Sequence, residues 1–446
     1  MGRLFILTGA SGSGKTELLN GLLRLHKEEF NMMQAKKYST RERRNDNDDI
    51  EHSASIDISN FDLVYNLNNV RYGIKYDEIE QQINTGKNVF IILSYIRVIK
   101  QLKERFKNQV SVIYVSSAVD SKRLDKIHTD RYIDSFCPTE EQNTILWEQF
   151  KKLKISIELE RWKDLFACMA ELNNEWKQYL PLNDSLEVRQ TKLRDFHKSY
   201  LDNIYLFDHV VLNYKFDEEE RADGIKGYDM YLQGYNIMKY YTTTEMPKRT
   251  KSKPVIFVVA AAAVAGKGIL LETVGDTIEK SVIKVISKQA KRESKPKDKR
   301  DGMIAIGENG IFGADFDITW EFHKDDKSGK GVEYAISSKE VAENTKNGCS
   351  QIVISNMGQF DMFREKYNDR VVFIYLHRLQ SVEDKKEYLY NNETPEDAEK
   401  KLKESDKVYD EYIKRLAEFD HVLLNTSFQE DLYEQIFTLI DYYNNN

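Results

Sequence analysis

Cysteine is scarce in this chain, with only Cys137, Cys168 and Cys349 among 446 residues. They form no CxxC pair and no Cys/His group, which argues against a disulfide framework or a zinc site and favours a reducing compartment. Long apolar runs are lacking too. The run Pro254–Ala265 is far shorter than the ~20 residues of a membrane span, and Lys267 closes it.

An excess of positive charge is also absent. The formal net charge is -7, which argues against nucleic-acid binding by bulk electrostatics. The chain begins MGRLFILTG, which predicts a strand and not a signal peptide. Hydrophobic residues make up 41% and charged residues 31%, as in ordinary globular proteins. We therefore expect a cytoplasmic protein of two or three domains, with neither nucleic acid nor membrane as a partner.

Several segments recur in the same order along the chain. LFDHVVLN at Leu206–Asn213 matches EFDHVLLN at Glu418–Asn425, and FDLVYNL from Phe61 matches FDITWEF from Phe316. Each copy opens with an apolar strand, LFIL or VIFVV, that runs into a small-residue turn and a helix. Matches in one order predict a tandem duplication.

Strands alternate with amphipathic helices in both copies, which predicts α/β domains of three layers with parallel sheets. The predicted domains are 1–241 and 255–446, joined by a polar, basic linker at 242–254. The first domain carries a helical insert at about 138–200. For the tyrosine-rich stretch Tyr228–Tyr241 we expect packing between the domains, with a ligand surface as the alternative.

The segment GASGSGKT fits the phosphate-loop pattern G-x-x-x-x-G-K-[ST] and lies between a predicted strand and a predicted helix. Its backbone N–H groups and the helix N-terminus favour bound phosphate. We expect Lys15 to reach the β- and γ-phosphates of ATP and Thr16 to ligate Mg²⁺. The predicted ATP-binding residues are Gly9, Ala10, Ser11, Gly12, Ser13, Gly14, Lys15 and Thr16.

The stretch KKYSTRERR at Lys37–Arg44 resembles the S-Y-T-T-R-x-x-R segment of the guanylate kinase family. That resemblance implies that Arg41 and Arg44 hold the phosphate of the acceptor and act in catalysis with Lys15. The closing strand FDHVVLN is also similar to that family. The fold expected from the resemblance is a tandem pair of P-loop nucleoside-monophosphate-kinase-like domains.

The acceptor site departs from the family pattern. Asn66 stands where the family has its guanine-reading glutamate, and Ser94 stands where it has an aspartate. In these places the chain is similar to ribose 1,5-bisphosphate phosphokinases, which open M-G-K-L-I-W-L-x-G-P-S-G-S-G-K and carry Y-Y-G-V and N-G-S-R. The resemblance implies an acceptor site of Arg41, Arg44, Asn66, Tyr72 and Ser94.

Lid arginines close over ATP in the family, and four arginines of this chain are candidates for that role. Ordinary surface arginines are the alternative interpretation, because the helical insert falls within the lid. The four candidates are Arg123, Arg131, Arg189 and Arg194.

The second phosphate loop, AAAVAGKG at Ala261–Gly268, is degenerate. Gly266 and Lys267 remain, but the metal-binding hydroxyl has become a glycine. In the following basic run, Lys291 meets the position of Arg41, and a lysine is a point charge instead of a bidentate fork. We expect this domain to be non-catalytic, as a regulatory binder or a structural partner.

Together these features predict a phosphotransferase that uses ATP and Mg²⁺. Its acceptor would be a small phosphorylated molecule, either a nucleoside monophosphate such as GMP or dGMP, or a phosphoribosyl compound. The alternative is a non-catalytic guanylate kinase-like protein that binds nucleotide or acts as a scaffold or regulator.

Overall fold

The computed structural model describes residues 2–10, 12–40, 51–52, 57–67, 70–117, 195–213, 228–243, 251–277, 282–294, 298, 302–322, 331–380, 382–426 and 429–445. The N-terminal half denotes the described residues up to 243, and the C-terminal half those from 251 onward. Apart from Asp195 and Phe196, the described residues of both halves belong to one compact unit. Among the described helices, none has the length and apolar character needed to cross a membrane.

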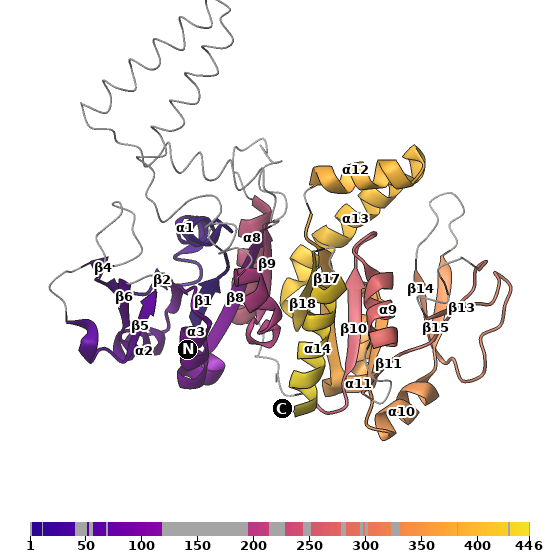
Figure 1. Cartoon of the computed structure of the whole chain (residues 1–446), viewed down its shortest axis with the longest axis horizontal. Coiled ribbons are helices and arrows are strands. Elements are labelled where there is room, and N and C mark those ends of the chain that lie inside the picture. Colours follow the sequence, from indigo (N-terminus) through magenta and orange to yellow (C-terminus); the bar gives the residue numbers. More distant parts are fainter. Residues whose placement is uncertain are drawn as a thin grey trace, which may run out of the picture. The chain divides into compact units, whose positions relative to one another are not determined.

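The N-terminal half contains a five-stranded parallel sheet in the order β2-β7-β1-β8-β9. Figure 1 labels β1, β2, β8 and β9 of this sheet. Its strands are β1 (Leu4–Thr8), β2 (Met32–Gln34), β7 (Asn88–Ile92), β8 (Val110–Ser117) and β9 (His209–Asn213). Every residue of β1 is buried. Since successive side chains point to opposite faces, both faces of the sheet are covered. The predicted parallel α/β arrangement is confirmed for this half.

The described helices of this half are α1 (Lys15–His26), α2 (Tyr76–Asn84), α3 (Ile96–Phe106) and α8 (Tyr228–Thr243). In α3 the buried residues Val98, Ile99, Leu102 and Phe106 recur at helical spacing. Residues 195–201, at the end of the predicted insert, are helical. The rest of the predicted insert, 138–194, lies outside the described residues.

Helix α8 is the tyrosine-rich stretch of the sequence, and it contacts both halves. It packs on α1 within the N-terminal half. Gln233 donates a hydrogen bond to the hydroxyl of Tyr409 at 3.4 Å, and Asn236 donates one to the carbonyl of Ile413 at 2.9 Å. The expected packing between the halves is therefore found. The helix continues through Thr243, so it includes the first two residues of the predicted linker.

The C-terminal half contains a second five-stranded parallel sheet, in the order β11-β16-β10-β17-β18. Its strands are β10 (Ile256–Ala261), β11 (Ile283–Val285), β16 (Ser350–Ser355), β17 (Val371–Arg378) and β18 (His421–Asn425). Its helices are α9 (Lys267–Thr277), α10 (Ser338–Lys346), α11 (Phe360–Tyr367), α12 (Val382–Asn392), α13 (Pro395–Arg415) and α14 (Gln429–Asn445). The strand order corresponds position by position to that of the first sheet.

Each half also has a small four-stranded sheet with antiparallel pairs, which the expectation of parallel sheets did not include. In the N-terminal half the order is β4-β3-β6-β5, formed by β3 (Tyr38–Ser39), β4 (Glu51–His52), β5 (Leu63–Leu67) and β6 (Val70–Ile74). In the C-terminal half it is β13-β12-β15-β14, formed by β12 (Lys288–Ala290), β13 (Met303–Ala305), β14 (Ile318–Phe322) and β15 (Val332–Ile336). The short connections β5–β6 and β14–β15 permit only antiparallel pairing.

Candidate functional site

The turn after β1 has a backbone shape that only glycine adopts readily. The φ angle is 141° at Gly9, 82° at Gly12 and 97° at Gly14, in the range that L side chains avoid. A Cβ on Gly9 would lie 2.3 Å from the carbonyl oxygen of Val115, and one on Gly14 would lie 2.9 Å from Nδ2 of Asn213. At Gly9 and Gly14, therefore, both the backbone conformation and the available space require glycine.

Lys15 begins α1, and its side chain turns back over the loop. Its Nζ donates to the carbonyl oxygens of Gly9 at 2.8 Å and Ala10 at 2.5 Å. The ammonium group thus lies beside the N-terminus of α1, where the unsatisfied N–H groups and the helix dipole favour an anion. This arrangement can bind phosphate.

Two hydroxyl residues flank Lys15. The Oγ of Ser13 is buried and has no hydrogen-bond partner within the described structure, so a ligand oxygen could satisfy it. Thr16, in the first turn of α1, is exposed. Among the described residues no group of three or more His, Cys, Asp and Glu could hold a metal ion. Mg²⁺ needs only one or two protein oxygens when phosphates supply others, so Thr16 fits that role beside a bound triphosphate.

Asn213, the last residue of β9, stabilises the loop Gly9–Thr16 by a hydrogen bond. Its Nδ2 donates to the carbonyl oxygen of Ser13 at 3.0 Å, and the residue is buried. The sequence interpretation gave Asn213 no role. A signal was present, because both copies of the repeat end on asparagine, at Asn213 and Asn425.

The loop of the C-terminal half keeps the same lysine contacts. Nζ of Lys267 donates to the carbonyl oxygens of Ala261 at 3.3 Å and Ala262 at 3.1 Å. Gly268 stands at the position of Thr16. This loop therefore retains its cation and lacks the hydroxyl for a metal at that position.

The backbone shape of the second loop is also retained. Gly266 has a φ of 102°, and Val264, at the position of Gly12, has a φ of 55°. The Nδ2 of Asn425 donates to the carbonyl oxygen of Ala265 at 2.8 Å. A β-branched residue in the left-handed region is a rare and costly conformation, so the loop keeps its shape although the sequence no longer favours it.

The small sheet of the N-terminal half brings two predicted acceptor residues into one area. The rings of Tyr65 and Tyr72 stack with centroids 5.2 Å apart, and those of Tyr65 and Tyr95 with centroids 6.1 Å apart. Tyr95 directly follows Ser94, which is half-buried just beyond β7. An aromatic stack that the sequence interpretation did not include thus joins Tyr72 to Tyr95, the residue that follows Ser94.

Asn66 lies elsewhere. It pairs across the strands with Arg71, while Tyr65 pairs with Tyr72. Because neighbouring residues of a strand point to opposite faces, Asn66 lies on the opposite face of the small sheet from Tyr72. The alternation within FDLVYNL indicates Tyr65, and not Asn66, as the residue on the face of Tyr72.

Two cations of the basic run in the C-terminal half pair with carboxylates of the same half. Lys291 pairs with Glu333, with Nζ and Oε2 2.5 Å apart. Arg292 makes a bidentate pair with Asp298, at 2.9 and 2.5 Å, and the hydrogen bond to Asp298 raises the pKa of Arg292. Two cations that could have held an acceptor phosphate are therefore occupied by carboxylates.

Several predicted site residues lie outside the described residues, and the structure gives no position for them. They are Ser11, Arg41 and Arg44, together with the lid candidates Arg123, Arg131, Arg189 and Arg194.

The chain has no match in sequence among known families or curated proteins. Among solved structures, guanylate kinase from Anaplasma phagocytophilum is similar over 45% of this chain and 90% of its own, with 16% identity and a TM-score of 0.30. That score is too low to support a functional conclusion.

Proposed function

We propose that the N-terminal half is a phosphotransferase of the P-loop kinase type, which transfers a phosphoryl group from ATP to a small phosphorylated acceptor. The observation that carries this proposal is the loop Gly9–Thr16. It combines glycines in the required conformation, the ammonium of Lys15 over the loop, and the unsatisfied buried hydroxyl of Ser13. The fastening of the loop by Asn213 supports a preorganised site.

ATP with Mg²⁺ would supply the phosphoryl group and part of the charge neutralisation. Lys15 would hold the β- and γ-phosphates, and Thr16 would be the protein ligand of the metal. Arg41 and Arg44, by resemblance to guanylate kinases, would bind the acceptor phosphate. The attacking oxygen belongs to a phosphate that is already ionised, so positioning and charge stabilisation suffice without a general base.

The acceptor would be a nucleoside monophosphate, such as GMP or dGMP, or a phosphoribosyl compound. The stacked rings of Tyr65, Tyr72 and Tyr95 offer an aromatic surface on which a base can stack. Asn66, on the other face of the small sheet, would then contribute less to acceptor binding than Tyr65.

For the C-terminal half we propose a non-catalytic role, as a binding or regulatory module derived from the same plan. The replacement of the loop hydroxyl by Gly268 and the pairing of Lys291 and Arg292 with carboxylates favour it. A chain in which both halves only bind nucleotide is the second candidate function for the whole protein.

An ADP-release screen with the full chain tests these proposals. The acceptors would be nucleoside monophosphates, deoxynucleotides and phosphoribosyl compounds, each with ATP and Mg²⁺. We expect turnover with at least one acceptor, its loss in Lys15→Ala, and a change of less than about tenfold in Lys267→Ala, or ~1.4 kcal/mol of barrier. Absence of acceptor-dependent ADP release throughout would favour the non-catalytic alternative.

A further inference from the structure

A hollow lies beside the second loop, in the C-terminal half. It measures about 330 Å³, including the part that opens to solvent. Its walls come from the loop itself, the end of β17, and helices α12 and α13. Its lining includes Ala262, His377, Arg378, Lys385, Ser405 and Tyr409.

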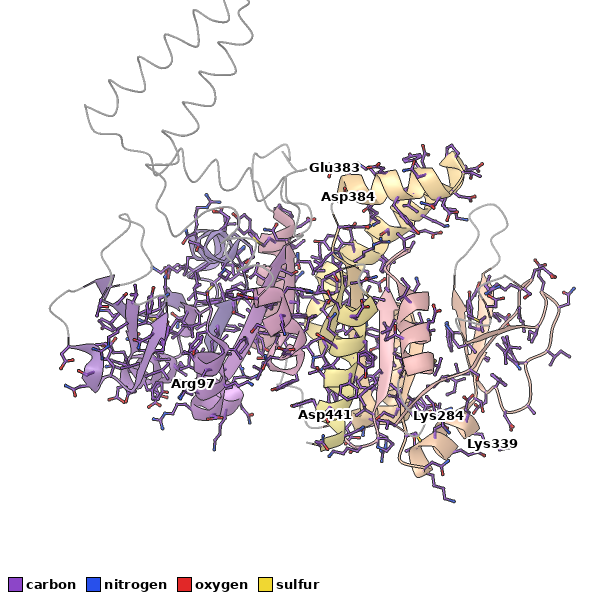
Figure 2. The ribbon with its side chains drawn as sticks, in the orientation of Figure 1. Arg97, Lys284, Lys339, Glu383, Asp384 and Asp441 are labelled. Atoms are coloured by element: carbon purple, nitrogen blue, oxygen red, sulfur yellow. The ribbon has the colours of Figure 1, made fainter. Side chains whose placement is uncertain are left out.

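Lys385 is an unusual residue in this wall. It lies in α12 and is only 7% exposed, and its Nζ donates to the hydroxyl of Ser405 on α13. The preceding residues Glu383 and Asp384, at the first turn of α12, are exposed (Figure 2). Burying an ammonium group is costly unless charge or hydrogen bonds compensate it. Helix α12 therefore contributes Lys385 to the wall of the hollow, and the carboxylates of Glu383 and Asp384 are not part of that wall.

A second cation and a neutral histidine complete this wall. Arg378, the last residue of β17, lies over the ring of Tyr388 with its Cζ 5.0 Å from the centroid. His377 is buried, and burial together with the charge of Lys385 lowers its pKa to about 3, so it is neutral. None of the described residues that line the hollow is acidic. Such a wall suits an anion.

The adjoining loop supplies the second observation. Lys267 lies over the carbonyls of Ala261 and Ala262, and the loop keeps the phosphate-binding backbone shape at Val264 and Gly266. A strained backbone that persists where the sequence disfavours it indicates a retained function. Gly268 removes the metal-binding hydroxyl, so that function does not include efficient transfer.

We propose that this hollow binds a phosphate group of a small ligand without Mg²⁺, at Lys385 of α12 and beside the loop that carries Lys267. The site is separate from the one proposed for catalysis and does not depend on it. The hollow opens to solvent, so the remainder of a larger ligand would extend outward from the phosphate.

The site has a direct route to the N-terminal loop. Tyr409 lines the hollow, and its hydroxyl donates to the carbonyl oxygen of Leu212 at 3.2 Å. The next residue, Asn213, holds the carbonyl of Ser13. A bound phosphate would therefore lie one side chain away from the strand that fastens the catalytic loop.

Calorimetric titration of the full chain tests the proposal. Lys15→Ala would serve as the background, to weaken the N-terminal phosphate site, and EDTA would remove metal. The titrants would be pyrophosphate, inorganic phosphate and ATP. We expect one equivalent of at least one of them to bind in EDTA. Binding of ATP alone would identify a nucleotide ligand, and binding of pyrophosphate or phosphate would identify the free anion.

Adding Lys385→Met should weaken that binding by roughly tenfold or more, since a charge-assisted hydrogen bond is lost. The matched control is Lys386→Met, an exposed neighbour on the same helix, which should leave it unchanged. If Lys385→Met lowers the unfolding midpoint, Lys267→Ala provides the second measurement, with the same expected loss. No binding in EDTA, or equal effects of Lys385→Met and Lys386→Met, would overturn the proposal.

Discussion

The hydroxyl of Tyr200 donates to the carbonyl oxygen of Val422 at 2.6 Å, and the hydroxyl of Tyr412 donates to the carbonyl oxygen of Val210 at 2.7 Å. Val210 lies in β9 and Val422 in β18, at matching positions of the two repeats. Each tyrosine thus belongs to one half and satisfies the closing strand of the other. The two bonds are reciprocal, as in the self-complementary interface of a two-fold dimer.

The same pair gives a stability prediction. Tyr200→Phe and Tyr412→Phe each leave a buried carbonyl without this donor, and each should lower the free energy of unfolding by ~1–3 kcal/mol. Urea unfolding followed by circular dichroism would measure this. Tyr390→Phe, at an exposed position of α12, is the control and should change stability little. Equal midpoints for all three variants would show that the reciprocal bonds contribute nothing.

A second prediction concerns the asparagines that fasten the loops. Asn213→Ala removes a hydrogen bond to the loop of the proposed catalytic site, so KM for ATP should rise about fivefold, which corresponds to ~1 kcal/mol. Asn425→Ala makes the same change in the second loop and should leave turnover and KM unaltered. Steady-state kinetics of both variants would test this. A larger effect of Asn425→Ala would place catalysis in the C-terminal half.

The strand β1, the phosphate loop and the parallel sheets could be predicted from the sequence. Their signals, which are a buried apolar run, a glycine pattern and helical periodicity, are all local. Sequence reasoning missed what depends on contacts between distant segments. Tyr200 and Tyr412 acquire their role only when the two halves meet. Nearer in sequence, it also gave no role to Asp298, whose carboxylate pairs with Arg292.

The strain at Val264 gives a third prediction. Glycine adopts its φ of 55° without the penalty of a β-branched side chain, although glycine loses more chain entropy on folding. Val264→Gly should therefore raise the free energy of unfolding by up to about 1 kcal/mol. Gly12→Val should lower it, because it introduces the same strain in the first loop. Thermal unfolding of both variants would measure these changes. Destabilisation by Val264→Gly would mean that packing of the valine side chain contributes more stability than its left-handed backbone conformation costs.

A fourth prediction separates the faces of the small sheet. Tyr65→Ala disrupts the aromatic stack with Tyr72 and Tyr95, so it should raise KM for the acceptor about tenfold or more, given ~1–3 kcal/mol per stacked base. Asn66→Ala changes the neighbouring residue on the opposite face and should raise KM less than about threefold. The acceptor found in the ADP-release screen would be used. A larger rise in KM for Asn66→Ala than for Tyr65→Ala would show that Asn66 contributes more to acceptor binding than Tyr65.

A fifth prediction concerns pH. Burial, with smaller effects of the Arg3 and Lys103 charges, lowers the pKa of His209 to about 3. Between about pH 6.5 and pH 3 the unfolded chain therefore binds a proton that the folded chain does not, and stability falls as pH falls. The urea midpoint should be lower at about pH 5 than at about pH 7.5. His209→Gln should reduce this difference, and an unchanged difference would exclude His209 as a source.

Strands β9 and β18 are the last strands of their sheets, and they contact each other. An edge strand with unpaired backbone groups is a template for self-association. Here β9 covers the edge strand β18 of the other sheet, and β18 covers β9. A polypeptide cut at the linker would present its own edge to a second copy, so separated halves should recombine with each other or form homodimers instead of remaining monomeric. The chain thereby carries within itself the partner that each edge strand would otherwise need from a second molecule.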